Sequence, residues 1–228
     1  MPFVRRFTPA LAVLVALVAA GPAGASIREI GVDGAAPLPK PGCPTQCEAV
    51  GQVTGYQVQI GKAKNPYLIG RKGKIVAFTV ALGKPNAKQL KFFTDLYGAK
   101  PQVRLSILKL GRRNREATLT AQSGAWNVGP YFGSSPTFAL SKALPVGPRS
   151  VVALTVPTWA PVFAVKLGQD MAWRSSRSSN ACGDVQQNAA HQTLNSVRSY
   201  GCFYRTARLT YSATFVPNPK PTTPPKKK

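Results

Sequence analysis

This 228-residue chain has four cysteines, Cys43, Cys47, Cys182 and Cys202. Their spacing indicates whether they bind a metal ion or form disulfide bonds. Structural zinc sites favour cysteine pairs separated by roughly two to four residues, which only Cys43 and Cys47 match. An even number of cysteines in an exported chain instead predicts disulfides. Pairing Cys43 with Cys47, and Cys182 with Cys202, needs the least rearrangement of the chain, and crossed pairing is the alternative.

His191 is the only histidine, which excludes zinc sites that need several histidines. A Ser–His–Asp triad would have to use His191 with Asp170 or Asp184 as its orienting residue. The G-x-S-x-G motif of many hydrolases is absent, and Ser123 in the stretch QSGAW lacks the preceding glycine. We therefore expect His191 to be an exposed loop residue and not a catalytic base.

Glu116 and Asp170 are the only pair of carboxylates that we consider for glycoside hydrolysis, and nothing in their spacing supports that chemistry. Acidic residues this sparse in a basic chain are more often partners in ion pairs. The sequence also contains no phosphate-binding glycine loop, dinucleotide motif or calcium loop. We predict no catalytic residue, no metal site and no cofactor.

Aromatic residues beside turn residues provide the first group of candidate binding residues. Trp126 and Tyr131 lie in a Gly/Pro-rich stretch, Trp159 lies in the corner PTWAP, and Trp173 precedes Arg174. Aromatic side chains on loops stack on sugar rings or nucleobases, and a neighbouring arginine adds a cation–π contact. Tryptophans in β-sandwiches also fill the core, so burial is the alternative. The candidates for ligand contact are Trp126, Tyr131, Trp173 and Arg174.

Basic turns provide the second group of candidates. The stretches GKAKNPYLIGRKGK and KLGRRNRE supply Lys62, Lys64, Arg71, Lys72, Arg112 and Arg113. The two basic turns could meet at one end of a sandwich. Charge alone would give salt-sensitive binding without sequence specificity, so binding to nucleic acid would be nonspecific.

Residues 1–25 have the pattern of a secretory signal peptide. Arg5 and Arg6 precede an apolar run at 10–20, and Ala23-Gly24-Ala25 offers the small residues of a cleavage site. The run is short for a membrane span, which needs about 20 apolar residues, although a retained anchor is the alternative. Cleavage would leave 28 of the 30 basic residues against 7 acidic ones, a net charge of +21 in place of +23.

An excess of positive charge of this size favours polyanions as partners: anionic cell-wall polymers, nucleic acid or a lipid surface. A surface that only confers solubility is the alternative. After cleavage we expect no transmembrane span and an extracellular protein, secreted or associated with the cell envelope.

The rest of the chain reads as short strands. Residues 102–110 alternate apolar and polar side chains, and 74–82 is a nearly continuous β-branched run. Residues 202–215 resemble one half-buried strand, with apolar residues from Phe203 to Phe215 on one face and polar residues including Arg208 on the other. Residues 86–98 break this pattern, because Asn86 and Gln89 form a capping-box pair and Gly98 suits a helix end. We predict one helix over 87–97.

Strands at this density with one helix predict an all-β fold, an antiparallel β-sandwich or jelly-roll-like domain. We expect an irregular leader at 26–42, a single domain at 43–216 and a disordered Pro/Lys-rich tail at 217–228. The polar segment 174–201, with Cys182 inside it and Cys202 directly after it, is long for a loop. We consider this cysteine-bounded segment a candidate binding surface, with a functionless insertion as the alternative. This layout resembles that of exported proteins of high-GC bacteria in composition alone and implies no activity.

Three functions are consistent with these features. The first is a secreted, non-enzymatic β-domain that binds an anionic or saccharide component of the cell envelope or surroundings. The second is a secreted hydrolase of a polysaccharide or ester, which would use His191 or a carboxylate pair. The third is a structural or interaction module without a small ligand.

Overall fold

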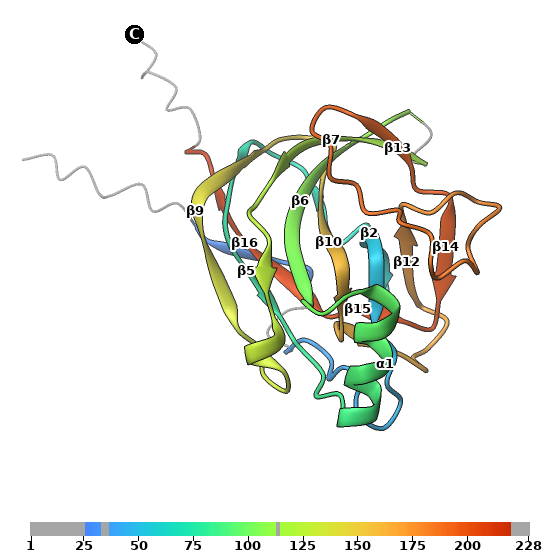
Figure 1. Cartoon of the computed structure of the whole chain (residues 1–228). Coiled ribbons are helices and arrows are strands. Elements are labelled where there is room, and N and C mark those ends of the chain that lie inside the picture. Colours follow the sequence, from blue (N-terminus) through green and yellow to red (C-terminus); the bar gives the residue numbers. More distant parts are fainter. Residues whose placement is uncertain (1–25, 33–36, 113–114, 220–228) are drawn as a thin grey trace, which may run out of the picture.

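The computed structural model describes residues 26–32, 37–112 and 115–219. The expected signal peptide, Arg113 and the tail from residue 220 lie outside this part of the chain. The described chain consists mainly of antiparallel strands, and its sheets curl around a shared core like part of a barrel (Figure 1). The prediction of an all-β, sandwich-like fold with one helix is confirmed.

The larger sheet has ten strands, seven of which follow one another edge to edge. In spatial order these are β13 (Val197–Ser199), β7 (Glu116–Gln122), β6 (Gln102–Leu110), β10 (Ser150–Ala160), β2 (Val50–Ile60), β12 (Met171–Ser175) and β14 (Cys202–Arg205). The remaining three strands are β3 (Ala63–Lys64), which pairs with β2, β4 (Leu68–Ile69), which pairs with β10, and β8 (Trp126–Asn127), which pairs with β6.

The smaller sheet has four strands, in the order β1 (Arg28–Ile30), β16 (Tyr211–Pro217), β5 (Gly73–Val80) and β9 (Thr137–Val146). A further pair is formed by β11 (Phe163–Ala164) and β15 (Arg208–Leu209). The strand β1 lies inside the segment that we expected to be irregular, and it pairs with β16. Part of the leader therefore belongs to a sheet.

The strand β10 lies at the centre of the core because its sequence, SVVALTVPTWA, has apolar side chains on both faces. Its hydroxyl residue Thr155 is fully buried, and a buried hydroxyl needs a hydrogen-bond partner. Thr54 on β2 lies 2.7 Å from it and Ser106 on β6 lies 2.6 Å from it, measured between hydroxyl oxygens. These contacts join the three central strands by side chains as well as by backbone.

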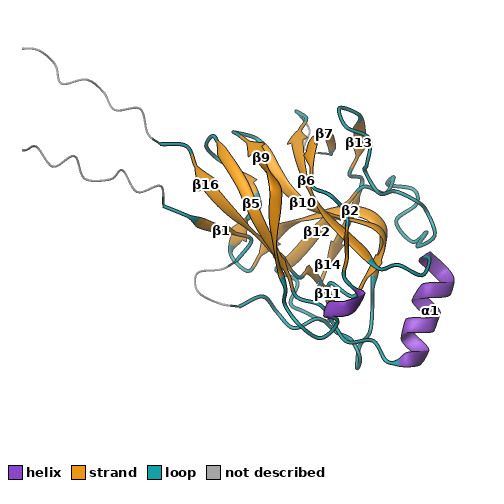
Figure 2. Cartoon of the chain, turned by 60° about the vertical axis from the view of Figure 1, so that its left-hand side comes forward, coloured by secondary structure: helices purple, strands orange, loops and turns teal. Residues whose placement is uncertain are grey.

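The helix α1 (Ala87–Tyr97) has the bounds that the sequence predicts. Asn86 and Gln89 form the reciprocal capping box, and the Gly98 amide donates to the Thr94 carbonyl at the other end. Phe93 is buried, with its ring centroid 5.2 Å from that of Trp159 on β10. Figure 2 shows that α1 lies outside the sheets, beside one end of them.

The prediction of one strand over residues 202–215 is wrong. The structure divides this segment into β14, β15 and β16, and Thr206 has a positive φ of 61° between the first two. The predicted apolar residues from Ala207 to Phe215 are buried as expected, but Phe203 is 41% exposed, and Arg208 on the predicted polar face is buried. Arg208 Nη2 donates to the Gly31 carbonyl at 2.6 Å, which places its polar end against the leader.

No helix in the described ranges has the length and apolarity that crossing a bilayer would require.

Candidate functional site

The predicted basic turns lie at the same end of the larger sheet. The antiparallel register pairs Ser150, at the start of β10, with Lys109 near the end of β6 and with Ile69 on β4. The strand β2 also runs antiparallel to β10, so its end at Ile60 points the same way. The turns that carry Lys62, Lys64, Arg71, Lys72 and Arg112 therefore project from the end of the sheet at which β10 begins.

A turn that the sequence analysis did not single out connects these basic residues. Arg149, in the β9–β10 turn, donates from Nη2 to the carbonyl oxygens of Leu110 at 3.2 Å and Gly111 at 2.7 Å. Lys109 Nζ donates to the Pro148 carbonyl at 2.6 Å. The stretch GPRS, in which Arg149 has a positive φ of 65°, is the sequence signal for this turn. We call the cations Arg71, Lys72, Lys109, Arg112, Arg115 and Arg149 the basic end.

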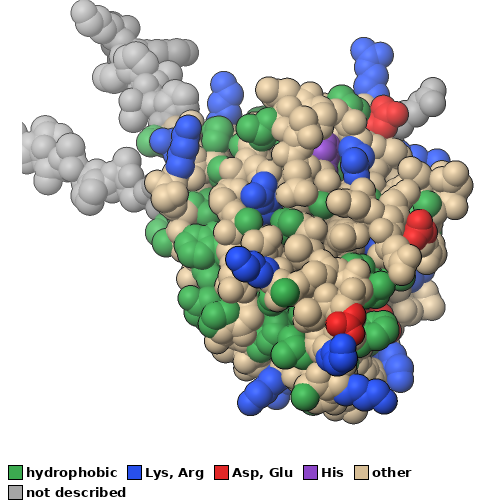
Figure 3. Space-filling view, in the orientation of Figure 1, with side chains coloured by type: hydrophobic (Ala, Val, Ile, Leu, Met, Phe, Trp, Pro, Cys, Tyr) green, Lys and Arg blue, Asp and Glu red, His purple; other side chains and the backbone are tan. Residues whose placement is uncertain are grey.

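The positive charge of the basic end is not neutralised by acidic side chains. Within the described ranges, the one ion pair is Lys91–Asp95 on α1, with 2.7 Å between Nζ and Oδ2. Figure 3 shows Lys and Arg side chains at many separate points of one face, with few acidic ones between them. Within the described chain, the basic end therefore presents cations that have no acidic partner.

A polar hollow of about 640 Å3 joins the basic end to the cysteine-bounded segment. Arg112, Arg115 and Glu116 line it from the β6–β7 turn. Ser179, Ser199 and Gly201 line it from the segment 174–201 that we singled out as a binding surface. The structure thus brings two of the predicted binding regions together.

The segment 174–201 is held in place at several points, because it begins in β12, contains β13 and is tied by a disulfide to the residue that follows it. Cys182 is bonded to Cys202, and Cys43 to Cys47, so the expected local pairing is confirmed. Between the two ends, the His191 amide donates to Thr54 Oγ1 at 2.9 Å, and the Ala189 amide donates to the Gln52 carbonyl at 2.8 Å. The segment therefore lies against β2 as an ordered surface.

The aromatic candidates Trp126 and Tyr131 lie away from the basic end. Trp126 pairs with Val103 at the start of β6, which is the end of the sheet nearer to α1. Its ring stacks on Phe138 with 4.7 Å between centroids, and Tyr131 meets the same ring edge-on at 5.5 Å. Trp126 is half-buried and Tyr131 is 41% exposed, so both keep one accessible side.

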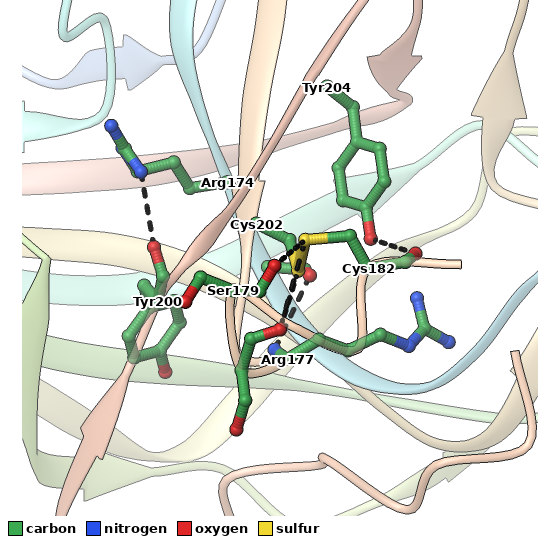
Figure 4. Close-up of a disulfide and its surroundings, with 9 residues drawn as sticks. Arg174, Arg177, Ser179, Cys182, Tyr200, Cys202 and Tyr204 are labelled. Atoms are coloured by element: carbon green, nitrogen blue, oxygen red, sulfur yellow. Dashed lines mark hydrogen bonds between the residues drawn. A yellow bond between two sulfur atoms is a disulfide. The ribbon is translucent and has the colours of Figure 1, made fainter. Parts of the chain in front are cut away.

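The other two tryptophans are buried. Trp159 is fully buried and its Nε1 donates to the Gly98 carbonyl at 2.9 Å, so it joins α1 to the core. Trp173 is 4% exposed and lies against Tyr204, with 4.7 Å between centroids. The next residue, Arg174, donates from Nη1 to the Tyr200 carbonyl at 3.2 Å (Figure 4). The structure therefore does not form one surface from the aromatic and the basic candidates.

The expectation that His191 is an exposed loop residue is wrong, because it is 2% exposed. Its Nδ1 lies 3.1 Å from the Tyr200 hydroxyl, and its Nε2 lies 2.9 Å from Ser196 Oγ. The Ser196 hydroxyl in turn donates to the Thr193 carbonyl at 2.6 Å. Neither Asp170 nor Asp184 is a hydrogen-bond partner of the ring within the described chain. These contacts brace the cysteine-bounded segment.

Burial lowers the pKa of His191 below its ordinary value of 6.5, Arg198 lowers it further, and a hydrogen bond with the Ser196 backbone opposes both. The unfolded chain therefore binds this proton more readily than the folded protein. The stability that depends on neutral His191 is complete above pH 6.5 and is lost as the pH falls toward the lowered pKa. We expect the free energy of unfolding, measured with urea, to decrease over this interval.

His191→Gln should remove this pH dependence, because His191 is the only histidine. The decrease at lower pH, where carboxylates take up protons, should remain in the variant. If the free energy of unfolding of His191→Gln falls below pH 6.5 as steeply as that of the parent chain, another group titrates in this interval.

Glu116 and Asp170 do not face one another as a catalytic pair. Glu116 begins β7 and Asp170 directly precedes β12, and three strands, β6, β10 and β2, lie between these two in the sheet. Adjacent strands lie about 4.8 Å apart, so the separation exceeds the roughly 5–9.5 Å between glycosidase carboxylates. Within the described ranges, no group of three or more His, Cys, Asp or Glu side chains is placed to hold a metal ion.

Comparison of the chain with known protein families, with curated proteins and with solved structures finds no match.

Proposed function

We propose that this protein is a secreted, non-enzymatic β-domain that binds an anionic polymer of the cell envelope or its surroundings, such as an acidic polysaccharide. The basic end and the polar hollow beside it form the binding surface. The observation that carries the proposal is the lack of acidic partners. From residue 26 on, 28 of the 30 Lys and Arg side chains remain against 7 Asp and Glu, and the described chain contains one ion pair, on α1.

The geometry of the basic end fits a polymer better than a small anion. Its cations come from several turns, and backbone carbonyls position the charged groups of two of them, Lys109 Nζ and Arg149 Nη2. A row of separated charges attracts a row of opposite charges, and this attraction is screened by salt. The two disulfides support the proposal of an extracellular location, because such bonds persist in oxidising compartments.

The test is retention of the chain from residue 26 on beads that carry an acidic polysaccharide, at low and at high salt. Replacing Arg71, Lys72 and Arg112 together with glutamine should weaken retention at low salt by about tenfold or more, since each cation near an anionic surface contributes roughly 1 kcal/mol. High salt should reduce the difference between the variant and the parent chain.

A matched control replaces Lys84, Lys88 and Lys100 with glutamine, which removes the same charge from the region around α1. This control should lose much less affinity than the variant at the basic end. Equal losses would contradict a binding surface at that end. A parent chain that no polyanion retains at low salt would contradict the proposal as a whole and favour a structural module.

A further inference from the structure

A cavity of about 200 Å3 lies between β2, β12, β14 and the last turn of α1. Four aromatic rings, those of Tyr97, Phe163, Trp173 and Tyr204, contribute to its lining, together with Arg177. The cavity shares no lining residue with the polar hollow at the basic end. It is a second, differently built site.

Two glycines of β2 make room for the rings of this cavity. A Cβ atom on Gly51 would lie 2.6 Å from the Tyr97 ring, and one on Gly55 would lie 2.8 Å from Trp173 Cζ3. Both rings therefore rest directly on the bare strand. Trp173 is held from two other sides, because Phe163 meets it edge-on at 5.4 Å and Tyr204 stacks on it. The apolar wall is thus fixed by packing before any ligand arrives.

Arg177 brings a charge into this apolar wall without an acidic partner. Its side chain is 7% exposed, and its Nη2 donates to the carbonyl oxygens of Gly51 at 3.2 Å and Val185 at 3.4 Å. Its Nε, like Nε1 of Trp173, is a buried donor with no hydrogen-bond partner in the described chain. In Figure 4 the guanidinium group lies on the same side of the Cys182–Cys202 bond as the Tyr204 hydroxyl. A buried cation is stabilised by a paired anion.

An apolar groove continues from the cavity along α1. It has a volume of about 470 Å3 and is lined by Phe92, Phe93 and Leu96 from the helix. Glu48, Ala49, Tyr97 and Val185 line both the groove and the cavity, so the two adjoin. Phe92 is 59% exposed and Val185 is 51% exposed, which leaves the groove open to a ligand.

We propose that this site binds a small amphipathic monocarboxylate, with the carboxylate in the cavity beside Arg177 and the apolar chain in the groove along α1. The one acid in the lining of the cavity, Glu48, is exposed, so water screens its charge from the ligand. The ligand differs from the polymer proposed above in size, in its apolar part and in the residues that it contacts. The two proposals therefore stand or fall separately.

The test uses octanoate as the probe, with octanol and octylammonium as uncharged and cationic probes of the same length. Chemical shifts of backbone amides in the 15N-labelled, oxidised protein report both the affinity and the place of binding. We expect saturable shifts at Gly51, Val185 and residues of α1 with octanoate, about tenfold weaker binding of octanol, and no binding of octylammonium. Equal binding of octanoate and octanol, or shifts confined to other regions, would overturn the proposal.

Three variants separate the parts of the site. Arg177→Gln should remove the preference for octanoate over octanol, but it can also disturb folding because Arg177 contacts two carbonyls. Phe92→Ser, at an exposed position, should weaken octanoate binding about fivefold, whereas Leu90→Ser on the same helix, outside the groove, should not. Equal effects of Phe92→Ser and Leu90→Ser would contradict the groove.

The triple variant at the basic end should bind octanoate as the parent chain does. A loss of octanoate binding in that variant would show that surface charge, and not Arg177, attracts the carboxylate, and would overturn the inference.

Discussion

Replacing Trp159 with alanine is expected to lower the free energy of unfolding by about 4 kcal/mol, because large buried aromatic side chains lose both transfer free energy and packing when truncated. Trp159 is fully buried, and Phe93 of α1 and Phe132 lie against its ring at 5.2 Å and 5.7 Å between centroids. The substitution also leaves the Gly98 carbonyl without the Nε1 donor. Urea unfolding followed by far-ultraviolet circular dichroism measures the change.

The matched control is Trp126→Ala. Trp126 is half-buried, and the buried ring on which it stacks is that of Phe138. We therefore expect the free energy of unfolding to fall by only about 1–2 kcal/mol. Equal losses for the two variants would show that Trp159 does not join α1 to the core. In both variants the free energy of unfolding should depend on urea concentration with the same slope as in the parent chain. An unchanged slope would show that the substitutions change the stability of the folded state and not the compactness of the unfolded chain.

Removing the Cys182–Cys202 bond by replacing both residues with serine is expected to cost about 3 kcal/mol, since a loop of 20 residues would regain its freedom in the unfolded chain. The bond also sets the local shape, because the Cys182 carbonyl accepts a hydrogen bond from the Tyr204 hydroxyl at 2.8 Å. We expect a lower melting temperature and earlier proteolytic cleavage between residues 178 and 190.

The corresponding double substitution at Cys43 and Cys47 provides the comparison. This bond joins residues only 4 apart in sequence, so the same chain-entropy argument gives a smaller loss, about 2 kcal/mol. A larger decrease in melting temperature at Cys43–Cys47 than at Cys182–Cys202 would contradict the entropic account and would indicate that the N-terminal turn holds more of the fold than its size implies.

The parts of the fold that the sequence predicted are those with a strong local signal. The capping box of Asn86 and Gln89, followed by Gly98, defined α1 to the residue. The alternation in residues 102–110 defined β6 in the same way. Local disulfide pairing was favoured by the short separations in sequence, with crossed pairing left open, and the structure has the local pairing. For α1 and β6, neighbours in the sequence determine the structure.

The strand β9 was missed because its register breaks. Its pairing with β5 shifts between Ile75 and Ala77, so the alternation of apolar and polar residues in TFALSKALPV is lost halfway along. It is also an edge strand with one side unpaired, which relaxes the requirement for apolar residues. A search of the sequence for regular alternation of apolar and polar residues does not detect such a strand.

The candidate sites depended on tertiary contacts that no local pattern encodes. The sequence places Trp173 and Arg174 side by side, yet alternation along β12 sends the first into the core and the second toward Tyr200. Arg177 was not singled out, because nothing in the stretch RSSRSS shows that its side chain is buried against Gly51. The basic turns were recognised as turns because charged and turn-forming residues are visible in the sequence, and their role in binding stays a prediction.

The edge strands of the two main sheets carry part of the excess positive charge, and this affects how two copies of the chain can approach each other. The four edge strands are β1, β9, β13 and β14, and each carries a cation: Arg28, Lys142, Arg198 and Arg205 respectively. The unpaired backbone groups of an edge strand are a template on which another chain can add its own strand. Three of these edges are only three or four residues long, and the longest, β9, includes Pro145, which has no amide hydrogen to offer. Two copies that approach edge to edge therefore meet cations and few free donors, so the basic composition on which the proposed polyanion binding rests also disfavours pairing between the edges of two copies.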